Sequence, residues 1–211
     1  MSKAVMISIQ PKWCEKIASG KKTIEVRKTR PKTDVPFKCY IYQTKLRWVY
    51  TLLHALGFFA IARRLARGVG KVIGEFVCDE IIEFYEETLA HDELDGNPVE
   101  AWMMWNMSDN LCEVLHLYEM EDVERCTCLT SAEILSYLHP NMNGYGWHIS
   151  DLVIYDEPKE ILSFSYPCKE DCDTCKYNRL NPWANSIEPV MMCQRDVTKA
   201  PQSWCYVEEL K

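Results

Sequence analysis

SGKKTIEVR, residues 19–27, is the stretch of this sequence that most clearly indicates the fold. Within it, Ile24 and Val26 alternate with polar residues, and side chains at alternate positions of a strand share one face. The stretch therefore predicts a short strand with one apolar face for the core. Its other face and its entrance carry the polar residues: Lys22, Thr23, Glu25 and Arg27.

The flanking sequence supplies the other elements of the predicted fold. AVMISI (4–9) is an apolar run suited to a buried strand, and QPKWCEKIASG (10–20) predicts a short helix, with Pro11 in its first turn and Gly20 as its stop. Three later segments are expected to form strands: FKCYIYQT (37–44), GKVIGEFVCDEIIEF (70–84, with Gly70 and Gly74 as turn or bulge positions) and YGWHISDLVIYDEP (145–158, ended by Pro158). Short strands with few helices favour an α+β protein built on a small β-barrel.

A first insertion, at about residues 46–68, interrupts this pattern. Residues 48–66, WVYTLLHALGFFAIARRLA, are apolar nearly all round, but their uncharged core is short for a membrane span. We expect an inserted helix that packs on the protein or binds a partner. The alternative is a helix lying in a membrane interface, with Arg63, Arg64 and Arg67 at its basic end.

A second insertion is expected at about residues 98–138. VEAWMMWNM (99–107) and SAEILSYL (131–138) are both predicted to be helices, the latter capped by Thr130 or Ser131. Both insertions fall within a main domain of residues 1–165, and a small tail of residues 166–211 follows.

Charge is distributed unevenly along the chain. The net charge is −7, but residues 1–71 sum to +13 and residues 72–211 to −20. This asymmetry suggests a basic face for an anionic ligand beside an acidic remainder. The alternative is that the two halves pair with each other. No apolar run follows a basic start at the N-terminus, so we expect a cytoplasmic protein.

The polar residues of the predicted strand suit a nucleotide. Arginine offers a fixed fork for a phosphate or a base edge, lysine a mobile charge, and glutamate an acceptor for an exocyclic amine. Arg27, Lys22 and Glu25 would supply these three functions. The alternative is a surface ion pair between Glu25 and Arg27 that contributes little to stability.

The pattern Gly-x-Lys-x-x-Glu-x-Arg, formed by Gly20, Lys22, Glu25 and Arg27, resembles the ASCH domain, a compact β-barrel related to the PUA fold. The resemblance covers about residues 1–164 and is greatest to versions carried by bacteriophages and prophages. Three further segments share it: ISIQPKWCEKI, GKVIGEF and YGWHISDLVIYDEPKEI.

This resemblance implies a cleft that binds RNA or a modified nucleoside. Some family members are amidohydrolases that act on acylated cytidine with a lysine, a threonine nucleophile and a glutamate base. Lys22 matches the lysine, but Glu25 occupies the threonine position, which puts that mechanism in doubt. Thr23 lies one residue after the lysine rather than three. Glu75 in GEF resembles an acidic residue of the family, and the alternative is a carboxylate at a strand end near water.

The expected nucleotide-binding and catalytic residues follow from these arguments. An aromatic ring would stack on a base, and Trp13, Tyr145 and Trp147 are the candidates. The expected nucleotide-binding set is Trp13, Lys22, Thr23, Glu25, Arg27, Trp147 and His148. The catalytic candidates are Lys22, Glu25 and Glu75.

The tail is rich in cysteine. Cys172-x-x-Cys175 has the spacing of a zinc knuckle, and Cys193 and Cys205 would complete four thiolate ligands for one zinc ion, with Cys168 as a substitute. An iron–sulfur cluster is a weaker alternative, because fewer than 40 residues follow Cys175. Free reduced thiols are the third alternative.

Three functional hypotheses result. The first is a protein that binds RNA or a modified nucleotide. The second is an amidohydrolase of acylated nucleosides such as N4-acetylcytidine. The third is a phage protein that binds a host protein through residues 48–66.

Overall fold

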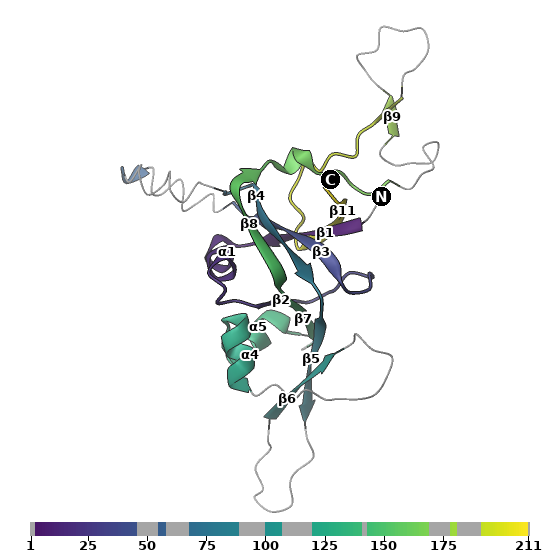
Figure 1. The fold of residues 1–211 in the computed structure, drawn as a ribbon. Coiled ribbons are helices and arrows are strands. Elements are labelled where there is room, and N and C mark those ends of the chain that lie inside the picture. The colour runs from purple at the N-terminus through teal and green to yellow at the C-terminus, as the bar shows by residue number, and fades with distance from the viewer. Residues whose placement is uncertain are drawn as a thin grey trace, which may run out of the picture. The chain divides into compact units, whose positions relative to one another are not determined.

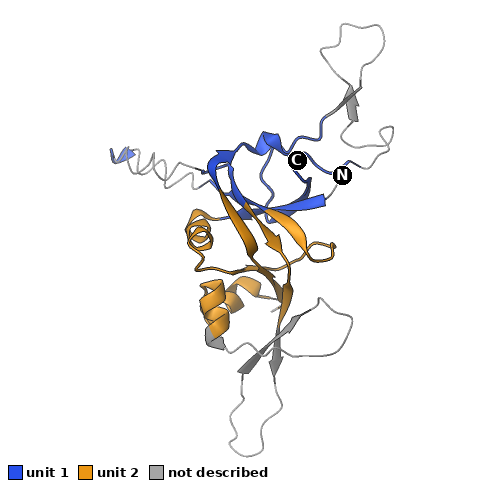
Figure 2. Ribbon diagram, viewed as in Figure 1, with its two compact units in different colours: residues 1–9, 40–74, 155–211 blue, residues 10–39, 75–154 orange. Residues whose placement is uncertain are grey.

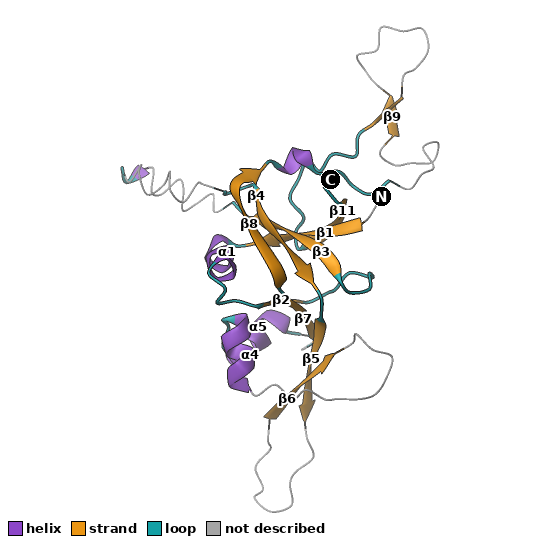
Figure 3. Cartoon of the chain, viewed as in Figure 1, coloured by secondary structure: helices purple, strands orange, loops and turns teal. Residues whose placement is uncertain are grey.

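The structure is a computed structural model, and it describes residues 3–45, 55–57, 68–88, 100–106, 120–140, 143–168, 178–180 and 191–210. Figure 1 labels the helices and strands, and Figure 3 colours them by type. The chain divides into two compact units (Figure 2). Unit 1 comprises residues 1–9, 40–74 and 155–211, and unit 2 comprises residues 10–39 and 75–154.

In unit 1, the two ends of the chain pair with each other. Strand β1 (Lys3–Ile9) runs antiparallel to β11 (Trp204–Glu208). The core cluster of this unit consists of eight buried residues: Ala4, Met6, Tyr40, Tyr42, Val72, Phe164, Val197 and Val207. Because Val197 and Val207 are fully buried, the end of the predicted cysteine-rich tail contributes to the core of unit 1. The division of the chain near residue 165 stays a prediction.

The largest sheet has the strand order β11-β1-β3-β4-β8. Its other strands each contain residues of both units: β3 (Phe37–Gln43), β4 (Val72–Cys78) and β8 (Ser150–Lys159). Short elements complete unit 1: the 3-10 helix η1 (Ile161–Ser163) and the paired strands β9 (Asn178–Leu180) and β10 (Met191–Cys193). The chain is therefore an α+β protein. Closure of its strands into a barrel stays a prediction.

Unit 2 is built on a four-stranded sheet of order β2-β7-β5-β6. Its strands are β2 (Ile24–Arg27), β5 (Ile81–Thr88), β6 (Glu100–Asn106) and β7 (Gly144–His148). Its helices are α1 (Pro11–Ala18), α4 (Met120–Thr127) and α5 (Ser131–Leu138). The apolar faces of the sheet and of α4 and α5 form one core cluster: Ile24, Val26, Ile82, Phe84, Val123, Ile134 and Leu138. This cluster fixes β2, whose opposite face carries the polar residues.

Several local sequence signals produce these elements. Pro11 is the first residue of α1, and Gly20 follows that helix with φ +70°, a conformation that glycine adopts without strain. Thr130 caps α5 in a capping box with Glu133, which satisfies backbone N–H groups at the helix start. Gly146 of β7 leaves space for the core, because a Cβ there would meet Ile24 and Phe84 side-chain atoms at 2.9 Å.

The helix predicted over VEAWMMWNM is wrong. Residues 100–106 form β6, which pairs antiparallel with β5 from Ile82 opposite Asn106 to Thr88 opposite Glu100. Methionine and alanine favour helices in isolation, but pairing along a neighbouring strand outweighs that local preference. The helix predicted over residues 131–138 is confirmed as α5.

Two predicted strands each prove to be two strands. The first divides into β4 and β5 on either side of Asp79 and Glu80, and the second into β7 and β8 around Ile149. Gly70 lies in a turn with φ +79° as expected, but Gly74 is an ordinary buried residue within β4. Pro158 lies inside β8 rather than after it.

Most of the segment predicted as a helix over residues 48–66 lies outside the described residues. Within the part of the chain that the structure describes, no helix is long and apolar enough to cross a membrane.

Candidate functional site

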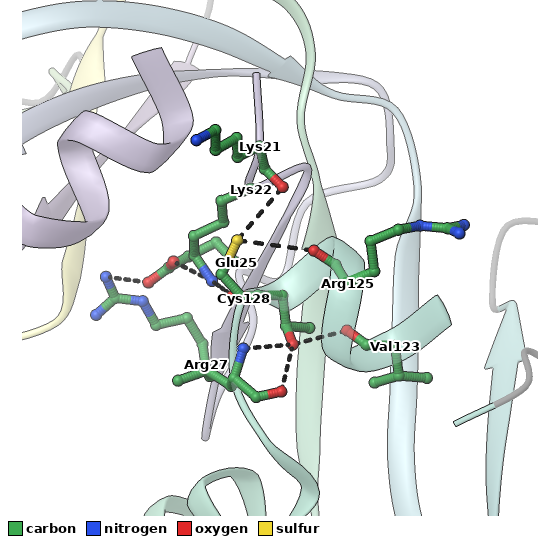
Figure 4. A network of polar contacts seen from close by, with 9 residues as sticks. Lys21, Lys22, Glu25, Arg27, Val123, Arg125 and Cys128 are labelled. Atoms are coloured by element: carbon green, nitrogen blue, oxygen red, sulfur yellow. Dashed lines mark hydrogen bonds and ion pairs between the residues drawn. The ribbon is translucent and has the colours of Figure 1, made fainter. Parts of the chain in front are cut away.

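The three charged residues of the motif form one ionic network. The Lys22 Nζ atom lies 3.3 Å from Glu25 Oε2, and Arg27 Nη2 lies 3.0 Å from Glu25 Oε1 (Figure 4). Both Glu25 and Arg27 belong to β2, and their side chains share a face because they are two residues apart. Glu25 therefore bridges the two cations.

This network is buried. The exposed fractions are 2% for Lys22, 6% for Glu25 and 7% for Arg27, so the alternative of a surface ion pair between Glu25 and Arg27 is wrong. Charges at this depth are tolerated only when opposite charges or hydrogen bonds compensate for lost water. The three side chains together carry a charge of +1, because two cations share one carboxylate.

Lys22 also joins β2 to the end of α4. Its Nζ donates a 2.7 Å hydrogen bond to the backbone oxygen of Thr127, the last residue of the helix. A cation is favourable there because carbonyl groups at a helix C-terminus carry partial negative charge. The Thr127 hydroxyl donates to the Val123 oxygen at 2.7 Å and accepts from the Leu129 N–H at 3.2 Å. Lys22 is thus a fixed charge, not the mobile one expected from the sequence.

Cys128 lies beside this junction. It has a φ of 54°, and its thiol donates to the backbone oxygens of Lys21 at 3.3 Å and Arg125 at 3.7 Å (Figure 4). Neither Cys128 nor Thr127 was among the residues expected at the site. Nothing in the local sequence relates residues 127 and 128 to Lys22, which is 105 residues away from Thr127.

Burial changes the acid–base properties of this region. Desolvation lowers the pKa of the Lys22 ammonium, although the nearby Glu25 carboxylate opposes the change. Desolvation also raises the pKa of the Cys14 thiol to about 12, and the Glu25 charge adds to this shift. Cys14 belongs to α1, so this helix also borders the polar face of β2.

Three aromatic rings with adjacent cations lie around the network. Lys12 Nζ lies 4.2 Å and Lys22 Nζ 5.3 Å from the centroid of the Trp13 ring. Two more pairs have comparable separations: Arg30 at 5.9 Å from the Tyr145 ring and Lys28 at 5.5 Å from the Tyr137 ring. Such contacts are typical of cation–π attraction. Trp13 was expected near the site, whereas Tyr137 was not.

A model of the ASCH domain matches residues 7–130, which is more than half of the chain. The chain belongs to the ASCH domain family. No curated protein matches it.

Solved structures of similar proteins come from Zymomonas mobilis. The crystal structure of its ASCH protein has a TM-score of 0.45 and 14% identity, and the match covers 98% of this chain and 88% of the other. A single-residue variant of that protein has a TM-score of 0.45 and 15% identity, with 99% and 92% coverage.

In this ASCH domain, Trp147 and His148 lie on opposite faces of β7. Trp147 pairs with Glu25 and is fully buried, with its ring 5.8 Å from that of Phe37. His148 pairs with Ile24, and its Nδ1 lies 2.7 Å from Asp79 Oδ1. Alternation along the strand therefore places His148 on the other face from the ionic network.

The remaining candidates are Thr23 and Glu75. Thr23 precedes β2, and its N–H donates to the Cys126 oxygen at 2.9 Å, so its backbone lies beside the end of α4. Glu75 of β4 pairs with Lys38 at 3.0 Å. The structure thus brings Trp13, Lys22, Glu25 and Arg27 together.

The predicted zinc ligands lie only partly within the described residues. Cys172 and Cys175 are outside them, and only the backbone of Cys193 is described. Burial raises the pKa of the Cys205 thiol to about 11. The Cys168 N–H donates to Glu208 Oε1 at 3.1 Å. Among the described residues, no group of three or more potential ligands is placed to hold a metal ion. The zinc site stays a prediction.

Proposed function

We propose that this ASCH domain binds RNA or a modified nucleotide at the polar face of β2. The observation that carries the proposal is the buried network of Lys22, Glu25 and Arg27 with its charge of +1. An anion of the ligand would be attracted by that charge, and a buried charge interacts more strongly than one in water.

Each residue has a distinct role in this proposal. The Arg27 guanidinium binds a phosphate or the edge of a base, since its planar fork fits either group. The Glu25 carboxylate accepts a hydrogen bond from an exocyclic amine. Lys22 holds that carboxylate in place from behind, because its own Nζ is fixed to Thr127.

Surrounding side chains favour a nucleic acid over a small inorganic anion. Lys12, Lys28 and Arg30 each lie beside an aromatic ring. Bases stack on aromatic rings while cations contact the phosphates between them, and this combination is typical of proteins that bind single strands.

A binding titration tests the proposal. Fluorescence anisotropy with a labelled single-stranded RNA is measured between about 50 and 200 mM salt, because phosphate contacts give a salt-dependent affinity. We expect Arg27→Gln to weaken binding and Arg27→Lys to have an intermediate effect, since it keeps the charge and loses the fork. Lys199→Gln removes an exposed positive charge of unit 1 and serves as the control.

Equal affinity of wild type, Arg27→Gln and Lys199→Gln would reject the site. Thermal unfolding checks that each variant is folded. If Arg27→Gln does not fold, Lys12→Ala provides the comparison, because Lys12 is exposed and lies beside Trp13, and an unchanged salt dependence there would also count against the proposal.

An amidohydrolase of acylated nucleosides is the second candidate. The lowered pKa of Lys22 favours it, because a lysine that loses its proton more readily can act as a base. However, Glu25 replaces the expected threonine nucleophile, and the Thr127 hydroxyl is fully buried and bonded to Val123. Incubation with N4-acetylcytidine and chromatography for cytidine decides the question, and no turnover at high protein concentration excludes this substrate.

A phage or prophage origin and a host-protein partner for residues 48–66 remain further proposals. A pull-down with the full chain and with a version lacking residues 48–66 tests the partner. Equal capture by both would exclude a role for that segment.

A further inference from the structure

Tyr137 combines exposure with a fixed position. It lies near the end of α5, between Ile134 and Leu138, which are buried in the core of unit 2. Tyr137 itself is 42% exposed. The helix therefore fixes the backbone of this residue while much of its side chain contacts solvent.

The hydroxyl end of Tyr137 lies at the end of β2. The backbone of Lys28 and the charges of Arg27 and Glu25 lie close enough to this hydroxyl to influence its pKa. Burial of the hydroxyl raises the pKa of Tyr137. A ring carried by a packed helix and lying beside Lys28 loses little backbone freedom when a ligand binds to it, and such preorganisation increases affinity.

Lys28 places a cation at the same ring. Its Nζ lies 5.5 Å from the ring centroid and donates a 3.0 Å hydrogen bond to the backbone oxygen of His139. Lys28 is exposed and follows Arg27 directly along the chain. An exposed aromatic ring and an exposed cation thus lie immediately beside the buried network but outside it.

The buried network and the exposed pair of Tyr137 and Lys28 would contact different parts of a ligand. The residues of the ionic network are more than 90% buried, whereas Tyr137 and Lys28 are exposed. A base stacked on Tyr137 would therefore be a different base from the one that contacts Glu25 and Arg27. Its phosphate would lie within reach of Lys28.

We propose that Tyr137 and Lys28 form a second subsite, which stacks the base adjacent to the one held by Lys22, Glu25 and Arg27. The ligand is then an oligonucleotide of at least two residues rather than a free nucleoside. This inference rests on the proposed function, because it assumes that the network binds the first nucleotide.

The experiment compares ligands of different length. Fluorescein-labelled pentacytidylate and pentaadenylate are titrated by anisotropy, and CMP and AMP are measured by competition. Wild type should bind the pentanucleotides more tightly than the mononucleotides. Tyr137→Ala should weaken pentanucleotide binding by about 5- to 150-fold, the effect of one stacked base, and leave mononucleotide binding unchanged.

Two further variants test the separate contributions of the Tyr137 ring and the Lys28 charge to pentanucleotide binding. Tyr137→Phe keeps the ring and removes the hydroxyl, so it should retain most of the pentanucleotide affinity. Lys28→Ala should reduce the slope of log affinity against log salt by about one, as expected for one lost phosphate contact. Thermal unfolding confirms that the variants are folded.

The outcomes distinguish this inference from the proposed function. If wild type binds pentanucleotides and mononucleotides equally, or if Tyr137→Ala leaves pentanucleotide binding unchanged, the second subsite is rejected while the first site stands. If Tyr137→Ala weakens both ligands equally, Tyr137 belongs to the first site and the second is again rejected. If wild type binds neither ligand, the proposed function fails and the inference fails with it.

Discussion

Replacing Glu25 by glutamine should destabilise this protein strongly. The change preserves the size of the side chain and removes the carboxylate that bridges Lys22 and Arg27. Both cations then remain in the interior without that carboxylate between them. Their mutual repulsion adds to the loss of attraction.

The size of this destabilisation can be worked out from the distances of Lys22 and Arg27 to Glu25. With an effective dielectric constant of about 20, opposite charges at 3.3 Å and 3.0 Å attract by about 5 kcal/mol each. Desolvation of the three charges offsets much of this attraction. Removal of one member of a buried ion pair lowers the free energy of unfolding by about 3–5 kcal/mol, and we expect Glu25→Gln to fall in this range.

Urea unfolding followed by tryptophan fluorescence measures the effect. For a slope of about 2 kcal/mol per molar urea, the midpoint should fall by about 2 M. Glu160→Gln is the matched control, because it makes the same chemical change in an exposed ion pair with Lys71, where the Glu160 side chain is 62% exposed. Exposed pairs contribute little, so this variant should unfold near the wild-type midpoint.

Equal midpoints for Glu25→Gln and Glu160→Gln would refute the reasoning. That result would mean that water or another group solvates Lys22 and Arg27 as well as Glu25 does, and the buried network would lose its structural role.

Three further predictions concern ionisation and metal binding. At pH 8, iodoacetamide should label Cys14 far more slowly in the folded protein than in the urea-unfolded protein, because a pKa of about 12 instead of 9.0 lowers its thiolate fraction about a thousandfold. Peptide mapping by mass spectrometry measures both rates, and comparable rates would contradict the burial of Cys14. The pKa of Lys22 in the folded state lies below its unfolded value of 10.5, so the unfolded state binds more protons between those two values and the Lys22 contribution to stability rises with pH in that window. The free energy of unfolding of wild type minus that of Lys22→Met should therefore increase towards pH 10.5, and a constant or falling difference in urea titrations would oppose this. Finally, protein purified without added metal should contain one zinc ion per chain by elemental analysis, and less than about a tenth of an equivalent would leave the tail cysteines as reduced thiols.

Much of the motif region could be predicted from the sequence. The alternation of Ile24 and Val26 with Glu25 and Arg27 is a local signal, and it correctly assigned one face of β2 to the core and the other to the charged residues. The helix before it was also predicted correctly, because Pro11 and the glycine after the helix mark its ends.

The partners of the motif could not be predicted in the same way. Thr127 and Tyr137 come from helices that lie about a hundred residues further along the chain, and no local pattern relates them to β2. His148 was expected in the nucleotide-binding set, but its pairing with Ile24 places it on the other face of β7, and only the register of the two strands could show this. Strand β6 was missed because its composition favours a helix until a neighbouring strand is available.

The hydrogen bond from Lys22 to Thr127 also determines when the site can form. It closes a loop across 105 positions of the chain, and Lys28 contacts His139 across 111 positions. During synthesis at about 5–20 residues per second, the motif therefore waits about 5–20 seconds for the residues that complete it. The entropy of closing such a loop increases only slowly, by about 0.6 kcal/mol for each doubling of its length. Longer loops between Lys28 and α4 would therefore cost the network little stability, whereas β3, β4 and β5 in the same stretch supply core residues such as Tyr40, Val72 and Phe84 and could not be lost.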